Sequence, residues 1–425
     1  MIHKLNNDFS LRDGGFSNYG DTVNLARHRW YYYKEGFSPL LVDRAIDEVG
    51  LRPNDFVIDP FNGSGTTTLS AALKGYKSIG IEVNPFTSFL ADAKLKTANL
   101  KELDSWLSNI SVAANKSQKS PLLGFSTFSQ SEKLEKWLFN DSVLNAFEGG
   151  WACAMEIPSY NLRKLMKLAL INSAMDNCNA TRDGKCLRYR AAWTSYNFDK
   201  ESFVSALIKN VNIIKADVER QQVLAKSTIF NADSRKQLSK GQLPGDFRLC
   251  ITSPPYLNTF DYTDIYRPEL FLGKFVKSVS ELYELRLTTV RSHIQARWEK
   301  PTSNDFGMLY QQSIAHLNSN PNGLMHKNIP LMVQAYFEDM LNILTLLRKK
   351  AARDAELWLV VSNSAYADKE IPVDLIIGEI GAKAGWFLKE IGVMRYIQRR
   401  KTKHSPNINS LRESVVIFTT NRNQR

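Results

Sequence analysis

The segment that most constrains the fold is a short apolar run that leads into a glycine turn and then into a helical pattern. Residues 56–59 have the pattern of a buried strand, two glycines follow within a few positions, and residues 66–74 are typical of the first turns of a helix. A second strand pattern covers residues 78–82. Strand, turn, helix and strand in this order predict a βαβ unit, and therefore an α/β fold with a doubly wound, mostly parallel sheet.

The glycine turn also has the properties of a ligand-binding loop. Gly63 and Gly65 can adopt positive φ and let a ligand approach the main chain closely. In dinucleotide-type folds, an acid about 20 residues beyond such a turn accepts ribose hydroxyls, and Glu82 lies 23 positions after Asp59. A phosphate-binding loop of the form GxxxxGK is excluded because no lysine follows the glycines.

A second candidate site follows another apolar run at residues 247–251 and reads Thr252-Ser253-Pro254-Pro255-Tyr256. Each proline fixes φ at about −65° and lacks an N–H, and the first also restricts the residue before it. We therefore expect a stiff corner whose carbonyls are not used by a sheet. Rigid acceptors beside an aromatic ring suit a planar heterocycle that carries an amino group. The alternative is a proline-terminated strand with a packed tyrosine.

Together, the two segments resemble conserved motifs of one enzyme family. Residues 59–67 (Asp-Pro-Phe-Asn-Gly-Ser-Gly-Thr-Thr) and 252–256 resemble motifs I and IV of the S-adenosylmethionine-dependent DNA amino-methyltransferases, the modification enzymes of restriction–modification systems. Residues 37–40 resemble the segment that closes over the methionine end of the cofactor, and residues 231–233 the motif near its adenine amino group. Residues 413–418 resemble the final strand pair.

This resemblance implies a Rossmann-like methyltransferase core that binds S-adenosyl-L-methionine and double-stranded DNA, with a cognate restriction endonuclease as a separate partner. The implied cofactor-binding residues are Phe37, Ser38, Asp59, Pro60, Phe61, Gly63, Ser64, Gly65, Thr66, Glu82 and Asp233. The implied catalytic residues are Ser253, Pro254, Pro255 and Tyr256. No metal is implied.

The target base is left open between cytosine and adenine. A serine before the two prolines is commoner in the cytosine-N4 branch, which favours transfer to the N4 amine of a flipped cytosine. However, the cofactor motif comes first here, whereas in many serine-type cytosine-N4 enzymes the catalytic motif comes first. Adenine N6 is the main alternative; an RNA amino-methyltransferase and an inactive nucleic-acid-binding homologue are more distant ones. A cytosine-C5 enzyme would need a thiolate beside its proline, and Cys250 lies back in the predicted strand.

The charge distribution suits a polyanionic partner. The net charge is +12 and the pI about 9.3, which is consistent with nucleic-acid binding. Residues 385–425 carry two acids, Glu390 and Glu413, against a larger set of basic residues. That set is Lys389, Arg395, Arg399, Arg400, Lys401, Lys403, Arg412, Arg422 and Arg425. We expect either phosphate contacts or a solvated basic segment.

Other residue patterns exclude several classes of protein. The four cysteines show neither CxxC spacing nor a disulfide framework, which indicates reduced thiols in a cytoplasmic protein. Neither a secretory signal nor an apolar stretch of about 18 residues that could span a membrane is present. The six histidines lack HxxxH and HxE spacing, so no metal site is predicted.

The chain is predicted to divide into a discontinuous core and two additional segments. The core covers residues 27–100, 226–275 and 331–425. Residues 101–225 are predicted to be a mostly helical insertion, with helical patterns at 133–139, 161–170 and 203–224, and a basic piece at 185–190 that is a candidate for DNA contact. Residues 276–330 are predicted to be rich in loops and to take part in target recognition.

Overall fold

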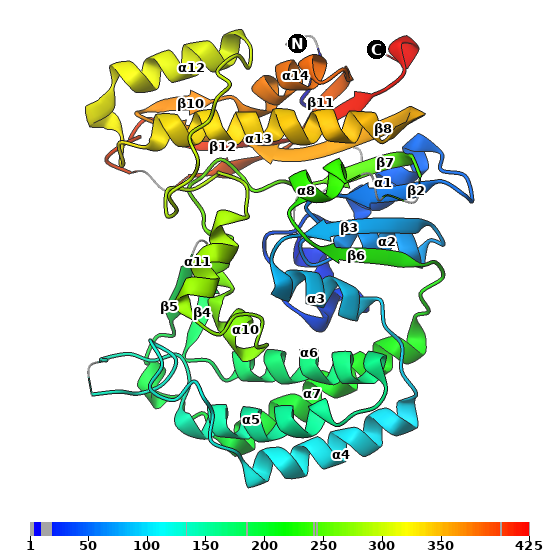
Figure 1. Ribbon diagram of the computed structural model, residues 1–425, viewed down its shortest axis with the longest axis vertical. Coiled ribbons are helices and arrows are strands. Elements are labelled where there is room, and N and C mark those ends of the chain that lie inside the picture. Colours follow the sequence, from blue (N-terminus) through cyan, green and yellow to red (C-terminus); the bar gives the residue numbers. More distant parts are fainter. Residues whose placement is uncertain are drawn as a thin grey trace.

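The computed structural model describes residues 4–9, 19–132, 134–183, 186–240, 243, 245–399 and 402–424. Within these residues, eight strands form the central sheet (Figure 1). In spatial order the strands are β1 (Leu5–Asn6), β11 (Phe387–Gln398), β12 (Ser410–Thr419), β8 (Ala351–Ser362), β7 (Phe247–Thr252), β2 (Phe56–Asp59), β3 (Lys77–Glu82) and β6 (Ser227–Asn231). Strand β12 is antiparallel to both of its neighbours, and the other neighbouring pairs run parallel. The predicted mostly parallel α/β sheet is confirmed.

Helices cover both faces of this sheet, so it is doubly wound. One face is covered by α1 (Pro39–Val49), α2 (Thr66–Leu73) and α3 (Pro85–Lys94), and the other by α8 (Ser234–Ser239), α13 (Ile329–Lys349) and α14 (Val373–Lys383). Strand β8 is an example of a strand that is covered on both sides. Trp358 and Val360 pack with α1. The alternating residues Leu357, Leu359 and Val361 pack with α13 and α14. A central strand that is buried on both sides is therefore continuously apolar.

The order of the strands reverses at β2. From β2 the chain adds β3 and then β6 on one side, and later crosses back to place β7 and β8 on the other side. Since β2 and β7 are parallel neighbours, their carboxyl ends lie at the same edge of the sheet. In open α/β sheets, ligands bind outside the carboxyl ends of the strands at such a reversal. The topology therefore directs attention to the residues that follow β2 and β7.

Most core elements agree with the sequence patterns. Strand β2 has the predicted bounds, and α1 begins as expected, with Ser38 as N-cap, its side chain accepting from Leu40 N, and proline at the first helical position. Helix α13, predicted over 336–350, begins earlier, at Ile329. Strands β1, β6 and β11 were not predicted: β1 is short and β6 is half exposed.

Residues between α3 and β6 form a layer of helices with its own apolar core, at the bottom of Figure 1. These helices are α4 (Leu100–Lys116), α5 (Asp141–Met155), α6 (Tyr160–Asp176) and α7 (Lys200–Arg220). The helix predicted at 133–139 is wrong for residues 134–139, and Lys133 lies outside the described residues. The backbone N–H groups of Leu138 and Phe139 instead donate to the carbonyls of Thr127 and Phe128, which a helix would not allow.

The same region contains a hairpin of β4 (Ala180–Asp183) and β5 (Cys186–Tyr189). It includes most of the basic piece at 185–190, of which Lys185 lies outside the described residues. Arg190 donates to the carbonyl of Cys178, and Arg188 pairs with Asp183 at 2.9 Å. Both cations thus have partners within the chain.

The segment 276–330 has more regular structure than predicted. It contains α11 (Val279–Leu287) and α12 (Met308–Ser319). Shorter elements that complete the fold are α9 (Tyr262–Ile265), α10 (Arg267–Leu272), β9 (Ser364–Tyr366), β10 (Lys369–Ile371) and the 3-10 turns Tyr19–Val23, His28–Trp30, Trp193–Ser195, Pro321–Gly323 and Arg422–Gln424. Among the described residues, no helix is both long and apolar enough to cross a membrane.

Candidate active site

The two motif segments, far apart in sequence, are joined directly at the reversal of the sheet. The hydroxyl of Thr252, at the end of β7, donates to Asp59 Oδ1, at the end of β2. In the first turn of α2, the Thr67 hydroxyl donates to the carbonyl of Ile251 at 3.2 Å. Side chains of the first motif therefore fix the position of the backbone from which the second motif begins.

A pocket of about 530 Å³ lies at this edge and is lined by both segments. Predicted site residues that line it are Phe37, Asp59, Pro60, Phe61, Gly63, Ser64, Thr66, Glu82, Asp233, Ser253, Pro254, Pro255 and Tyr256. Ser38 and Gly65 do not line it. Ser38 caps α1 and donates to Asp21, and Gly65 lies behind the turn against α3.

The glycine turn depends on backbone conformations that suit glycine. Gly63 and Gly65 have φ of 48° and 87°, in the left-handed region. A Cβ on Gly65 would lie 2.8 Å from the Cβ of Ala91. Gly65 thus lets α2 and α3 approach each other closely, and it acts on the pocket through this packing.

Glu82 holds the turn from the neighbouring strand. Its Oε2 accepts from Gly63 N and its Oε1 from Asn84 N, both at 2.8 Å. The pKa of this carboxyl is raised, mainly by burial, and these hydrogen bonds offset only part of the rise. A carboxylate offers about four acceptor positions, so Glu82 retains capacity to accept from hydroxyls of a ligand in the pocket.

Asp59 has a structural role within the turn. Besides the Thr252 hydroxyl, its Oδ1 accepts from Phe61 N at 2.9 Å. The side chain is 2% exposed, and burial raises the pKa of this carboxyl to about 6. Asp59 was predicted to bind the cofactor; this geometry supports a role in ordering the turn.

Tyr256 is held by a pair of residues that the sequence analysis did not assign to the site. Its hydroxyl donates to Glu413 Oε1 at 2.8 Å, and Arg395 pairs with Glu413 Oε2 at 2.7 Å. All three line the pocket. Burial, and then the Glu413 charge, raise the pKa of Tyr256 well above its ordinary value. The sequence signal that could have identified Glu413 is an acidic residue just before the apolar run at 415–418.

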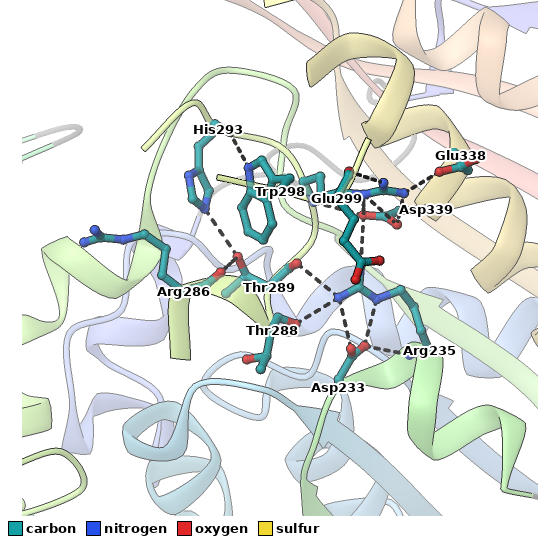
Figure 2. A network of polar contacts seen from close by, with 11 residues as sticks. Asp233, Arg235, Arg286, Thr288, Thr289, His293, Trp298, Glu299, Glu338 and Asp339 are labelled. Carbon is teal, nitrogen blue, oxygen red and sulfur yellow. Dashed lines mark hydrogen bonds and ion pairs between the residues drawn. The ribbon is translucent and has the colours of Figure 1, made fainter. Parts of the chain in front are cut away.

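Asp233 is also more constrained than its predicted role requires. It caps α8 and accepts from Arg235 through both carboxylate oxygens, at 2.9 and 3.0 Å (Figure 2). Arg235 in turn donates to the carbonyls of Thr288 and Thr289, which line the pocket as well. The segment after α11 thus forms the pocket wall next to Asp233.

This wall is anchored to α13 by further charged groups shown in Figure 2. Arg291 pairs with both Glu338 and Asp339, and Glu338 Oε1 accepts from Thr302 N at 2.8 Å. Part of the segment predicted to recognise the target is therefore fixed against the core.

Aromatic residues form another part of the wall that the sequence analysis missed. Tyr33 stacks on Tyr266, with ring centroids 5.4 Å apart, and the Tyr266 hydroxyl donates to Glu35. These three residues and Tyr262 line the pocket. The aromatic run at 30–33 was a possible signal, but it does not show which partner each ring contacts.

The basic segment near the end of the sequence provides less available charge than its composition indicates. Each of three cations pairs at 2.7 Å with a buried acid: Lys389 with Glu356, Arg412 with Asp374, and Arg395 with Glu413. Arg400, Lys401 and Arg425 lie outside the described residues. The paired cations neutralise carboxylates of the protein itself.

Comparisons with known proteins agree with this geometry. A family model of N6/N4 methyltransferases, described as DNA methylase, matches residues 15–91. The chain is 28% identical to the type II methyltransferase M.BsoBI of Geobacillus stearothermophilus, over 94% of this chain and 87% of that protein. It is 25% identical to M.AvaI of a Nostoc strain, over 87% and 80%, and 21% identical to M.MvaI of Kocuria varians, over 84% and 81%.

The fold, the paired motifs and these similarities define a DNA methyltransferase of the kind found in restriction–modification systems. More narrowly, the chain is similar to type II methyltransferases, and its family match is to the N6/N4 amino-methyltransferases.

This family implies S-adenosyl-L-methionine as the cofactor, and the pocket fits such a molecule. Its volume lies within the range of about 300–1,000 Å³ that small-molecule sites occupy. Glu82 has acceptor capacity for ribose hydroxyls, and the glycine turn exposes main chain to the pocket. In the part of the chain that the structure describes, no group of three or more His, Cys, Asp or Glu side chains could hold a metal ion.

Proposed function

We propose that this protein transfers a methyl group from S-adenosyl-L-methionine to the exocyclic N4 amine of a cytosine in double-stranded DNA. The observation that carries the proposal is the direct link between Asp59 and Thr252, which brings the cofactor motif and the Ser-Pro-Pro-Tyr corner to one pocket. Ser253 before the two prolines supports cytosine over adenine, through its resemblance to the cytosine-N4 branch.

The corner supplies acceptors for the target amine. An exocyclic amine is a poor nucleophile because its lone pair is delocalised into the ring. The Pro254 carbonyl, together with the Ser253 hydroxyl or carbonyl, would accept both amine hydrogens and localise that lone pair on nitrogen. The rigid corner keeps these acceptors in place, so that positioning contributes much of the acceleration.

S-adenosyl-L-methionine, when bound, supplies an electrophilic methyl group on its sulfonium. Glu82 would accept from ribose hydroxyls, and Asp233 would contact the adenine amine. Phe37 and the glycine turn would enclose the methionine end. With these contacts, the chain's own residues orient the ligand toward Pro254.

The target base has to leave the duplex because its amine is paired and stacked there. Tyr256 would stack on the extruded base, while Glu413 holds the tyrosine hydroxyl and so fixes the ring. No thiolate is required: Cys250 is buried within β7, and burial raises its pKa well above the ordinary value.

The partners and the division of the chain are part of the same proposal. Methylation would protect the sites of a separate restriction endonuclease in the same cytoplasm. We assign residues 27–100, 226–275 and 331–425 to the catalytic core, and DNA contacts to the helical layer and to segment 276–330.

The experiment compares tritium transfer from labelled cofactor to unmethylated duplex DNA by the unaltered protein, Ser253→Ala and Tyr256→Ala. Both variants should lower transfer by about tenfold or more, while calorimetry shows near-normal cofactor binding. Ser205→Ala, at an exposed position on α7, serves as the control. Full transfer by both variants of the corner would end the proposal.

A further inference from the structure

A buried lysine behind the glycine turn has no role in the function proposed above. Lys94, the last residue of α3, is 2% exposed. Lysine is almost never fully buried unless it is paired. Among the described residues, no carboxylate lies within ion-pair distance of Lys94, and burial alone lowers its pKa to about 7. Lys94 is thus a buried amine for which the described part of the chain provides no counter-ion, and an anion beside it would favour its charged form.

The position of Lys94 connects it to the pocket. It lines a small cavity of about 10 Å³, and the residues shared by this cavity and the main pocket are Tyr33, Gly36, Phe37, Ser64 and Thr66. Side chains on a helix lean toward its N-terminus, so Lys94 extends from the end of α3 toward the turn that packs on Ala91. A volume of about 10 Å³ holds one water molecule.

The neighbours of Lys94 add no negative charge. His28 lines the same small cavity, and burial, followed by the charge of Lys94, lowers its pKa to about 3, so this imidazole is neutral. Arg27 donates from Nη1 to the carbonyl of Lys94 at 2.9 Å, which fixes the end of the helix and adds a second cation nearby. An anion that reaches this corner of the pocket would meet an unopposed positive charge.

The proposed cofactor carries one anionic group, the α-carboxylate of its methionine part. Glu82 and Asp233 are placed for the ribose and the adenine, so the methionine part extends toward the glycine turn and Phe37. The cations that line the main pocket are otherwise engaged: Lys34 donates to the carbonyl of Arg182, and Arg395 pairs with Glu413. We infer that Lys94 binds the α-carboxylate of S-adenosyl-L-methionine, directly or through one water in the small cavity. This inference rests on the proposed function.

The test compares two ligands that differ in this carboxylate. Affinities of S-adenosylhomocysteine and of its decarboxylated analogue are measured by calorimetry on the full chain, with and without Lys94→Met. The unaltered protein should bind S-adenosylhomocysteine at least about tenfold more tightly than the analogue, as expected for a charge-assisted hydrogen bond. Lys94→Met should lose that factor for S-adenosylhomocysteine and lose nothing for the analogue.

Methionine fills the same volume without a buried charge, so the variant should melt no lower than the unaltered protein. Lys167→Met is the matched control. Lys167 is a half-buried lysine on α6. Its Nζ lies 5.7 Å from the ring centre of Phe89, a residue of α3, and it lines neither cavity. The Lys167→Met variant should bind both ligands normally.

Two results would overturn the assignment of Lys94: unchanged affinity for S-adenosylhomocysteine in Lys94→Met, or an equal loss for both ligands, which would indicate a structural role. Absence of binding of either ligand to the unaltered protein would instead contradict the proposed function itself.

Discussion

The ring and the hydroxyl of Tyr256 have separable roles, because the hydroxyl is bonded to Glu413 while the ring faces the pocket. Tyr256→Ala should lower methyl transfer about 10- to 100-fold, the range expected when base stacking worth about 1–3 kcal/mol is lost. Tyr256→Phe keeps the ring, and Arg395 still pairs with Glu413. It should cost less than about tenfold, since one hydrogen bond contributes about 0.5–1.5 kcal/mol. Equal losses in single-turnover rates of the two variants would show that stacking is not the role of the ring.

Asp59 gives the site a defined pH dependence of stability. Its pKa in the folded protein is about 6, above the ordinary value of 3.8. As the pH falls, the folded protein therefore binds this proton at a higher pH than the unfolded chain does. Burial of the charged form therefore lowers stability above pH 6, and this penalty disappears between pH 6 and pH 4. Asp59→Asn should be more stable than the unaltered protein at pH 8, by at most about 3 kcal/mol for two pKa units. In thermal melting, the difference in stability between Asp59→Asn and the unaltered protein should shrink toward pH 4.5. A difference that stays constant with pH would contradict this explanation.

At the scale of elements, the contact between α2 and α3 depends on Gly65. A Cβ there would clash with Ala91, and φ is 87°. Gly75 is a matched control, because its φ is 86° but nothing lies within 4 Å of an added Cβ. Both alanine variants carry the backbone strain of a positive φ, which costs about 1 kcal/mol or more. Gly65→Ala should lose further stability and weaken cofactor binding, as seen by urea unfolding and calorimetry, whereas Gly75→Ala should bind the cofactor normally. Equal effects would rule out a packing role for Gly65.

Elements of the core could be predicted from sequence where one short segment contains all the residues that determine the element. Residues 56–58 of β2 and 249–251 of β7 are apolar because both faces of these strands are covered, and α1 has its own cap in Ser38. The two motifs could be located from sequence for the same reason, and most of their residues line one pocket; their roles stay a prediction. Glu413, Arg395 and Tyr266 were not, because each acts through a partner far away in the sequence. The false helix at 134–139 arose because its periodicity reflects burial of Leu138 and Phe139 against Thr127 and Phe128 rather than a helical backbone.

At the scale of the whole molecule, the β4–β5 hairpin of the helical layer is joined to the pocket side of the core by one buried ion pair. Arg182 on β4 pairs with Glu269 on α10, which is fully buried and also accepts from the Tyr31 hydroxyl. Arg182→Met should destabilise the protein by about 3–5 kcal/mol because Glu269 is left without a counter-charge. The double variant Arg182→Met/Glu269→Gln should recover most of this loss in urea unfolding. If the double variant is as unstable as the single one, the pair does not join the hairpin to the core through charge.

We propose that the ends of β2 and β7 form one site for methyl transfer to an exocyclic amine of DNA. The most direct measurement is mass spectrometry of nucleosides from unmethylated duplex DNA after incubation with this protein and cofactor that carries a deuterated methyl group. The account predicts a labelled methyl group on N4 of cytosine. Label found only on a ring carbon such as C5 of cytosine, or no labelled nucleoside at all, would contradict it.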